Sequence, residues 1–88
     1  MKKVSKKLLD LAIENCRKYW ELPWNDCVEF GDEWQKVCIE IGEKTNSGWC
    51  AWKDFLGSLL STSGLNNTLT NDQIYEILKF LGWEVVDE

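Results

Sequence analysis

The stretch from Asp26 to Gly42 constrains the fold more than any other part of the chain. Its apolar residues recur at spacings of three and four, the period of a helix with one buried face. They are Cys27, Phe30, Trp34, Val37, Cys38 and Ile41. Charged residues follow the opposite stripe, namely Glu29, Asp32, Glu33, Lys36 and Glu40, with Glu43 just beyond. Gly31 and Gly42 lie between the two sets, where a neighbouring helix can approach closely. We therefore expect a central helix over residues 26–43 that packs against several others.

The same periodicity predicts three further helices, over residues 6–20, 48–60 and 70–81. Polar residues that cap helix N-termini stand at each start: Ser5, Asn25 or Asp26, Ser47, and Thr70 with Gln73. Residues 1–4 read as a frayed basic start. Trp83, Val85 and Val86 read as a short extended tail, either a strap over the core or a strand with no obvious partner. The expected fold is all-α, a small four-helix domain with a short extended C-terminal strap, and residues 1–88 form one domain.

Aromatic residues are unusually frequent, with six tryptophans among 88 residues. Most of them are expected in the core, because a large ring buries much apolar area in a small domain. A few side chains fall outside the predicted apolar faces. Trp24 lies in the connector after the first helix, Phe80 points away from the apolar stripe of the last helix, and Cys50 projects away from that of the third. These three side chains, together with Trp83 in the tail, are candidates for exposure.

Charge is unevenly distributed along the chain. Residues 1–20 carry a net +4 and residues 21–88 a net −9, which leaves −5 for the whole chain. One interpretation is that the basic first helix packs near the acidic body and gains modestly from it. The other is that an acidic surface faces a basic partner.

The four cysteines do not have the spacing of a metal site. The chain has no histidine and no Cys-x-x-Cys pair, so the usual structural zinc patterns are not met and no metal or cofactor is expected. The basic N-terminus is followed by an apolar run that Asp10 interrupts, which does not match a secretory signal. We therefore expect a cytoplasmic protein with buried free thiols. No apolar stretch approaches the roughly 20 residues that span a bilayer.

Catalytic motifs are also missing from the sequence. Without histidine, Cys–His and Ser–His–Asp arrangements are excluded, and the glycines are too widely spaced for a phosphate-binding loop. The acidic pairs of the central helix lie on a solvated stripe, so we expect no enzymatic activity. DNA binding by the last two helices is disfavoured, because residues 71–81 offer only Lys79 as a base while Asp72 and Glu76 oppose phosphate contact.

The remaining hypothesis is a non-enzymatic protein-binding module, a small acidic adaptor or an inhibitor of the kind that mobile elements encode, acting on a basic partner surface. Its candidate contacts are the acidic stripe and the surplus aromatic and thiol side chains: Glu29, Asp32, Glu33, Glu40, Glu43, Trp24, Cys50, Phe80 and Trp83. Two alternatives stay open. One is a self-associating structural protein, a homodimer through the third helix, and the other is a small DNA-binding helical domain.

Overall fold

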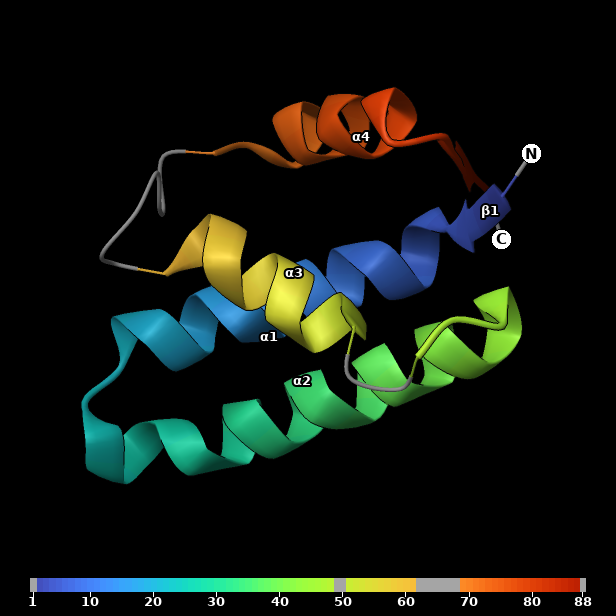
Figure 1. Cartoon of the computed structure of the whole chain (residues 1–88). Helices are drawn as coiled ribbons and strands as arrows, with labels where there is room; N and C mark the ends of the chain where they lie inside the picture. Colours follow the sequence, from blue (N-terminus) through green and yellow to red (C-terminus); the bar gives the residue numbers. More distant parts are fainter. Residues whose placement is uncertain (1, 49–50, 62–68, 88) are drawn as a thin grey trace.

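The computed structural model describes residues 2–48, 51–61 and 69–87, and in these residues it contains four helices and two short strands (Figure 1). The helices are α1 (Lys6–Glu21), α2 (Trp24–Thr45), α3 (Ala51–Leu60) and α4 (Asn71–Phe80). The strands are β1 (Lys2–Ser5) and β2 (Trp83–Val86). The prediction of a small all-α domain with four helices is confirmed.

Helix α1 begins where its capping signal predicts. The hydroxyl oxygen of Ser5 accepts a hydrogen bond from the backbone N–H of Leu8 at 3.3 Å. The helix then buries one face, formed by Leu9, Ala12, Ile13 and Cys16. It ends before Leu22, which is extended because the proline that follows disfavours helical geometry there.

Helix α2 is longer than predicted at both ends. It begins at Trp24, directly after Pro23, whose fixed φ of −57° suits a helix boundary, and no side chain caps it. The expected caps, Asn25 and Asp26, instead lie inside its first turn. The helix passes Gly42 and ends at Thr45. The residue that follows, Asn46, is its C-cap and adopts the left-handed conformation (φ 57°) that asparagine tolerates at such positions.

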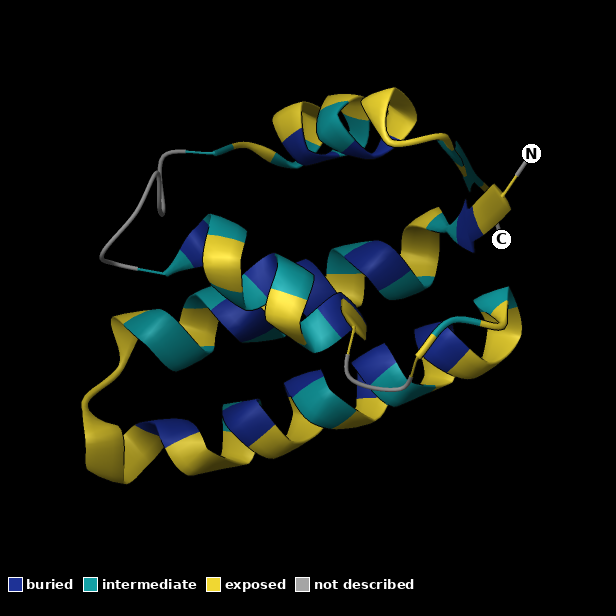
Figure 2. Cartoon of the chain, viewed as in Figure 1, coloured by how far each residue is buried: buried dark blue, intermediate teal, exposed yellow. Residues whose placement is uncertain are grey.

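The inner face of α2 supplies a large part of the core, as predicted. Trp34, Val37, Cys38 and Ile41 are all buried. Figure 2 shows the buried stripe of α2 facing the other helices and its exposed stripe facing away from them. Gly31 lets α1 approach, because the Tyr19 ring lies where a side chain at Gly31 would project. This confirms the close helix contact expected beside that glycine.

Helix α3 is described from Ala51, three residues later than its predicted start. Gly48 precedes the helix and accepts the N–H of Ala51 at 3.2 Å, and residues 49–50 lie outside the described residues. The Ser47 hydroxyl, the predicted cap, shares a 2.9 Å hydrogen bond with the hydroxyl of Thr45. The inner face of the helix is buried, with Trp52, Leu56 and Leu60 in the core.

Helix α4 begins with the predicted capping box, in which Thr70 and Gln73 each bond the other's backbone N–H through their side chains. Its residues Ile74 and Leu78 are buried. Polar contacts also hold it to α1. The Tyr75 hydroxyl and the Asn71 amide both donate to the carboxylate of Asp10, the latter at 3.2 Å.

The two ends of the chain pair with each other, which the sequence analysis did not predict. β1 and β2 form a parallel two-stranded sheet with Lys2 opposite Trp83 and Ser5 opposite Val86. The prediction of a frayed start was wrong, because Val4 is 1% exposed and belongs to the core. The C-terminal tail is therefore a strand that pairs with β1, and Val4 on β1 is buried in the core.

Candidate functional site

The outer face of α2 carries the five acidic residues that the sequence analysis selected. Glu29, Asp32, Glu33, Glu40 and Glu43 are all exposed. We call these five residues the acidic face. Within it, Lys36 pairs with Glu33 at 3.4 Å and Lys44 with Glu40 at 3.5 Å. In the described part of the chain no cation comes within 4 Å of the other three carboxylates. The acidic face therefore keeps a net negative charge on one rigid helix.

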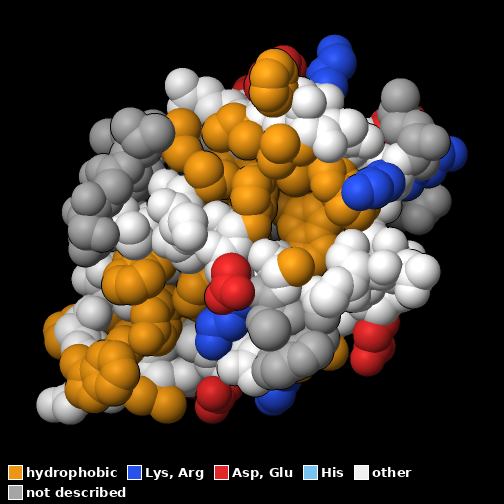
Figure 3. All heavy atoms as spheres, viewed as in Figure 1, with side chains coloured by type: hydrophobic (Ala, Val, Ile, Leu, Met, Phe, Trp, Pro, Cys, Tyr) orange, Lys and Arg blue, Asp and Glu red, His pale blue; other side chains and the backbone are white. Residues whose placement is uncertain are grey.

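An exposed apolar patch adjoins the acidic face where α1 leads into α2. Trp24 is 74% exposed, Val28 one turn later is 54% exposed, and Leu22 in the connector is 38% exposed. We call these three residues the Trp24 patch. Figure 3 shows apolar side chains gathered at the lower left, over this end of the molecule. Val28 and Asp32 are four residues apart on α2, so the patch and the acidic face are neighbours along one helix.

The backbone beneath the Trp24 patch is well fixed. The thiol of Cys27 is buried and donates to the carbonyl oxygen of Trp24 at 3.2 Å. The N–H of Asp26 donates to the carbonyl oxygen of Pro23 at 2.9 Å. The exposed indole is thus carried by an ordered first turn of helix, which limits the entropy lost when it is covered.

The remaining predicted contacts do not join this surface. Phe80 is 91% exposed, but it lies at the end of α4, on the opposite side of the molecule from α2 (Figure 1). Trp83 is half-buried, with its ring 4.9 Å from that of Trp52 and the Lys2 ammonium 5.3 Å above it. Cys50 lies outside the described residues. The structure therefore divides the eight predicted residues that it describes between the α2 surface and the α4–β2 region.

The described thiols are free and buried. Burial raises the pKa of Cys16 and of Cys38 to about 12, and neither side chain is exposed. Such thiols are poor nucleophiles and poor metal ligands, because both roles require the thiolate. Among residues 2–48, 51–61 and 69–87, no three His, Cys, Asp or Glu side chains gather as a metal site would require.

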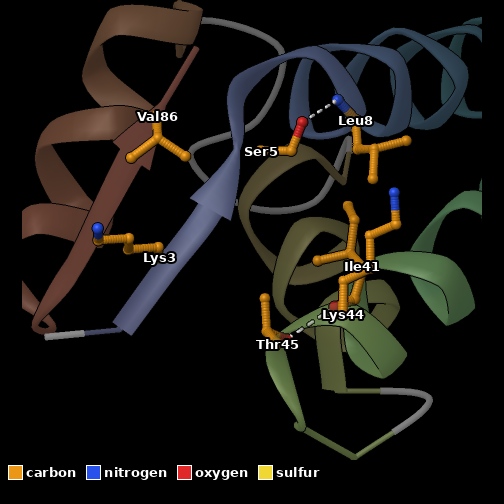
Figure 4. Close-up of a pocket in the computed structure, with 7 residues that line it drawn as sticks. All are labelled: Lys3, Ser5, Leu8, Ile41, Lys44, Thr45 and Val86. Carbon is orange, nitrogen blue, oxygen red and sulfur yellow. Dashed lines mark hydrogen bonds between the residues drawn. The ribbon is translucent and has the colours of Figure 1, made fainter. Parts of the chain in front are cut away.

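Two hollows border the sheet, and sequence reasoning missed both. The smaller, about 160 Å³, lies between β1 and the C-terminal end of α2. Figure 4 shows Lys3, Ser5 and Val86 on one side of it and Ile41, Lys44 and Thr45 on the other. The larger, about 450 Å³, is a groove between α4 and β2. The sequence offered one indication of either hollow, the two β-branched residues Val85 and Val86, which favour a strand. No partner for that strand could be recognised in the sequence.

Comparison of the chain with protein-family models, with curated proteins and with solved structures finds no match in any of the three. Within the described residues, none of the helices has both the length and the apolar content needed to cross a membrane. The assignment of function therefore depends on the surfaces described above.

Proposed function

We propose that this protein is a non-enzymatic protein-binding module, a small adaptor or inhibitor that docks on a basic surface of another protein. The observation that carries the proposal is the joint presence of the acidic face and the exposed Trp24 on one helix. Glu29, Asp32 and Glu43 lack a cationic partner among the described residues, so a basic surface can pair with them at little cost.

The two parts of this surface have different physical roles. Tryptophan is among the residues that most often dominate binding energy, because a large rigid ring fills a pocket and excludes water. Carboxylates around such an anchor contribute mainly to the association rate and to orientation. The opposite side of the same helix is fixed in the core by Trp34, Cys38 and Ile41, so the surface is organised before binding.

The two alternatives lack a comparable observation. A homodimer through α3 needs that helix to offer an apolar face, yet its Trp52 is 4% exposed and packs against Trp83. DNA binding by α4 needs basic residues on that helix, which has Lys79 but also Asp72 and Glu76. We also propose the cytoplasm as the compartment, in agreement with the free thiols of Cys16, Cys27 and Cys38.

The experiment that tests the proposal is affinity capture from a bacterial lysate, with elution by increasing salt and identification by mass spectrometry. The expected result is one stoichiometric protein that salt releases, since Coulomb attraction between exposed charges is screened. The same capture is repeated with the triple variant Glu29→Gln, Asp32→Asn and Glu43→Gln, which should retain little of that protein.

A matched control removes the same amount of charge elsewhere. The variant Glu14→Gln, Asp54→Asn and Asp87→Asn also loses three carboxylates, all exposed and all off the acidic face. It should capture the partner as the unaltered chain does. Equal loss in both triple variants would show that only net charge matters, and capture of nothing but further copies of the chain would refute the proposal.

A further inference from the structure

Each strand of the two-stranded sheet has an outer edge, and the outer edge of β2 has no hydrogen bonds to any element of the described chain. In the described part of the chain, β2 pairs with β1 alone. A ladder on one side uses the N–H and C=O groups of alternate residues, and the remaining groups face the other edge. No other hydrogen bond of the described residues reaches 83–86. A parallel pair of four-residue strands is also smaller than sheets usually are.

The uncovered edge opens onto the larger groove. β1 is flanked by the C-terminal end of α2, whereas β2 is flanked by α4. Figure 4 shows this order, with β2 between α4 and β1. The groove between α4 and β2 has a volume of about 450 Å³. Its walls are therefore a helix on one side and a strand edge on the other.

The lining of the groove combines apolar and charged side chains. Tyr75, Trp83 and Val85 provide the apolar surface, and each is only partly buried. The charged lining residues are Lys6, Lys79, Asp72, Glu76 and Glu84. None of these five takes part in an ion pair within the described part of the chain. Both signs are thus available to an occupant, with one more acid than base.

We propose that this groove binds an extended peptide segment of a partner protein, which lies between α4 and β2 and adds a third strand to the sheet. The unpaired N–H and C=O groups of a strand edge form their best hydrogen bonds with the backbone of another extended segment. Alternate side chains of that segment then enter the pockets beside the strand. The segment carries apolar residues at alternate positions, which contact Tyr75, Trp83 and Val85. It also carries a basic residue, which pairs with one of the acidic side chains of the groove. It binds antiparallel to β2, which is the more stable pairing.

A second copy of this chain does not fit the groove as a peptide does. The β2 strand of the copy is itself flanked by α4, so its outer edge is less accessible for pairing than the backbone of a free peptide. The groove is also on the opposite side of the molecule from the acidic face, and the proposal does not depend on that surface.

The test uses the full chain and a library of random peptides of about ten residues displayed on phage, a length that covers ordinary strands. Enriched sequences should alternate apolar with other residues and contain Lys or Arg. The best sequence is then synthesised, and its binding is followed by the amide signals of residues 83–86 in NMR spectra. These signals should shift most, and residues of the acidic face should shift little.

Main-chain pairing is tested without altering the protein. Two further peptides carry N-methyl groups at either the odd or the even positions, which removes alternate N–H donors. One of the two should bind at least about tenfold more weakly, because it loses the N–H donors that face β2, and the other should bind nearly as before. Equal affinity of both methylated peptides would overturn strand addition.

A matched pair of protein variants tests the location. Glu76→Trp places a large ring in the groove, and Glu43→Trp makes the same change on α2. The first should weaken peptide binding at least about tenfold and the second should not. No enriched peptide, or peptide signals that map to α2, would overturn the inference. A concentration-dependent mass that Glu76→Trp abolishes would assign the groove to a second copy instead.

Discussion

The ring of Tyr19 occupies the space into which a side chain at Gly31 would project. A Cβ built on Gly31 would lie 2.9 Å from Cε1 of Tyr19 and 3.0 Å from Cδ1, closer than such atoms pack. This contact joins α1 to α2 in the part of the core where Tyr19 also contacts Trp34, with ring centroids 5.6 Å apart. The glycine is therefore a condition for the packing of the two longest helices.

Replacing Gly31 with alanine should destabilise the protein despite the better helix propensity of alanine. The propensity gain is about 1 kcal/mol, whereas moving a packed ring costs about 1–3 kcal/mol, so we expect a net loss. Urea unfolding measures the difference. Gly48→Ala is the control, because a Cβ there meets nothing within 4 Å, and its midpoint should change little. A Gly31→Ala variant as stable as the parent would contradict the close contact.

Truncation of the two tryptophans on α2 should change the free energy of unfolding by very different amounts. Trp34 is 4% exposed and Trp24 is 74% exposed. Trp34→Ala should lower the free energy of unfolding by about 3–5 kcal/mol, as expected for a buried aromatic residue. Trp24→Ala should change it by less than about 0.5 kcal/mol. Chemical unfolding of both variants tests the pair, and similar losses in the two would mean that Trp24 is not free for a partner.

The pairing of the chain ends can be tested by amide hydrogen exchange. The backbone N–H groups of residues 2–5 that bond to β2 should exchange slowly, at a rate near that of core helices. Val4→Ala should speed their exchange and lower the free energy of unfolding by about 2 kcal/mol, since the Val4 side chain is buried. Lys3→Ala on the same strand is the control. Fast exchange throughout residues 2–5 in the unaltered chain would restore the interpretation of a frayed start.

Local patterns predicted the helices because each signal depends on neighbours in sequence. The spacing of apolar residues located α1 and α2, and the Thr70–Gln73 box located the start of α4 within one residue. The acidic face was predictable for the same reason, since it is the outward side of an amphipathic helix. The ends of α2 were harder to predict, because Pro23 can stand before a helix and Asn46 can end one without a glycine.

The sheet could not be predicted in this way, because its pairing is a relation between residues at opposite ends of the chain. Val4 lies between Lys3 and Ser5, and nothing near it in sequence indicates that it will pair with Val85. The groove beside β2 follows from that pairing, so it was missed as well. The half-burial of Trp83 against Trp52 has the same origin, since the strand carries that ring onto the core.

Stability should fall at alkaline pH because of two buried thiols. The pKa of Cys16 and of Cys38 is about 12 in the folded protein, raised mainly by burial, against 9.0 for a free thiol. A group whose pKa is raised by folding holds its proton more tightly in the folded state. Its contribution is therefore complete below about pH 9 and is lost as the pH rises from there towards 12.

The measurement is the free energy of unfolding from about pH 8 to about pH 11, for the parent and for Cys38→Ala. Each thiol lowers stability by at most about 1.4 kcal/mol per pH unit in this window, since only the unfolded chain ionises. The variant should be less stable at neutral pH because it leaves a cavity, yet its stability should decline less steeply with pH. The other titrating groups are common to both proteins, and the one that Cys38 affects acts in the same direction: the pKa of Cys16 is raised by burial and further by Cys38, so removing Cys38 also weakens the contribution of Cys16 to the decline. Identical slopes would show that the Cys38 thiol ionises as readily in the folded protein as in the unfolded chain.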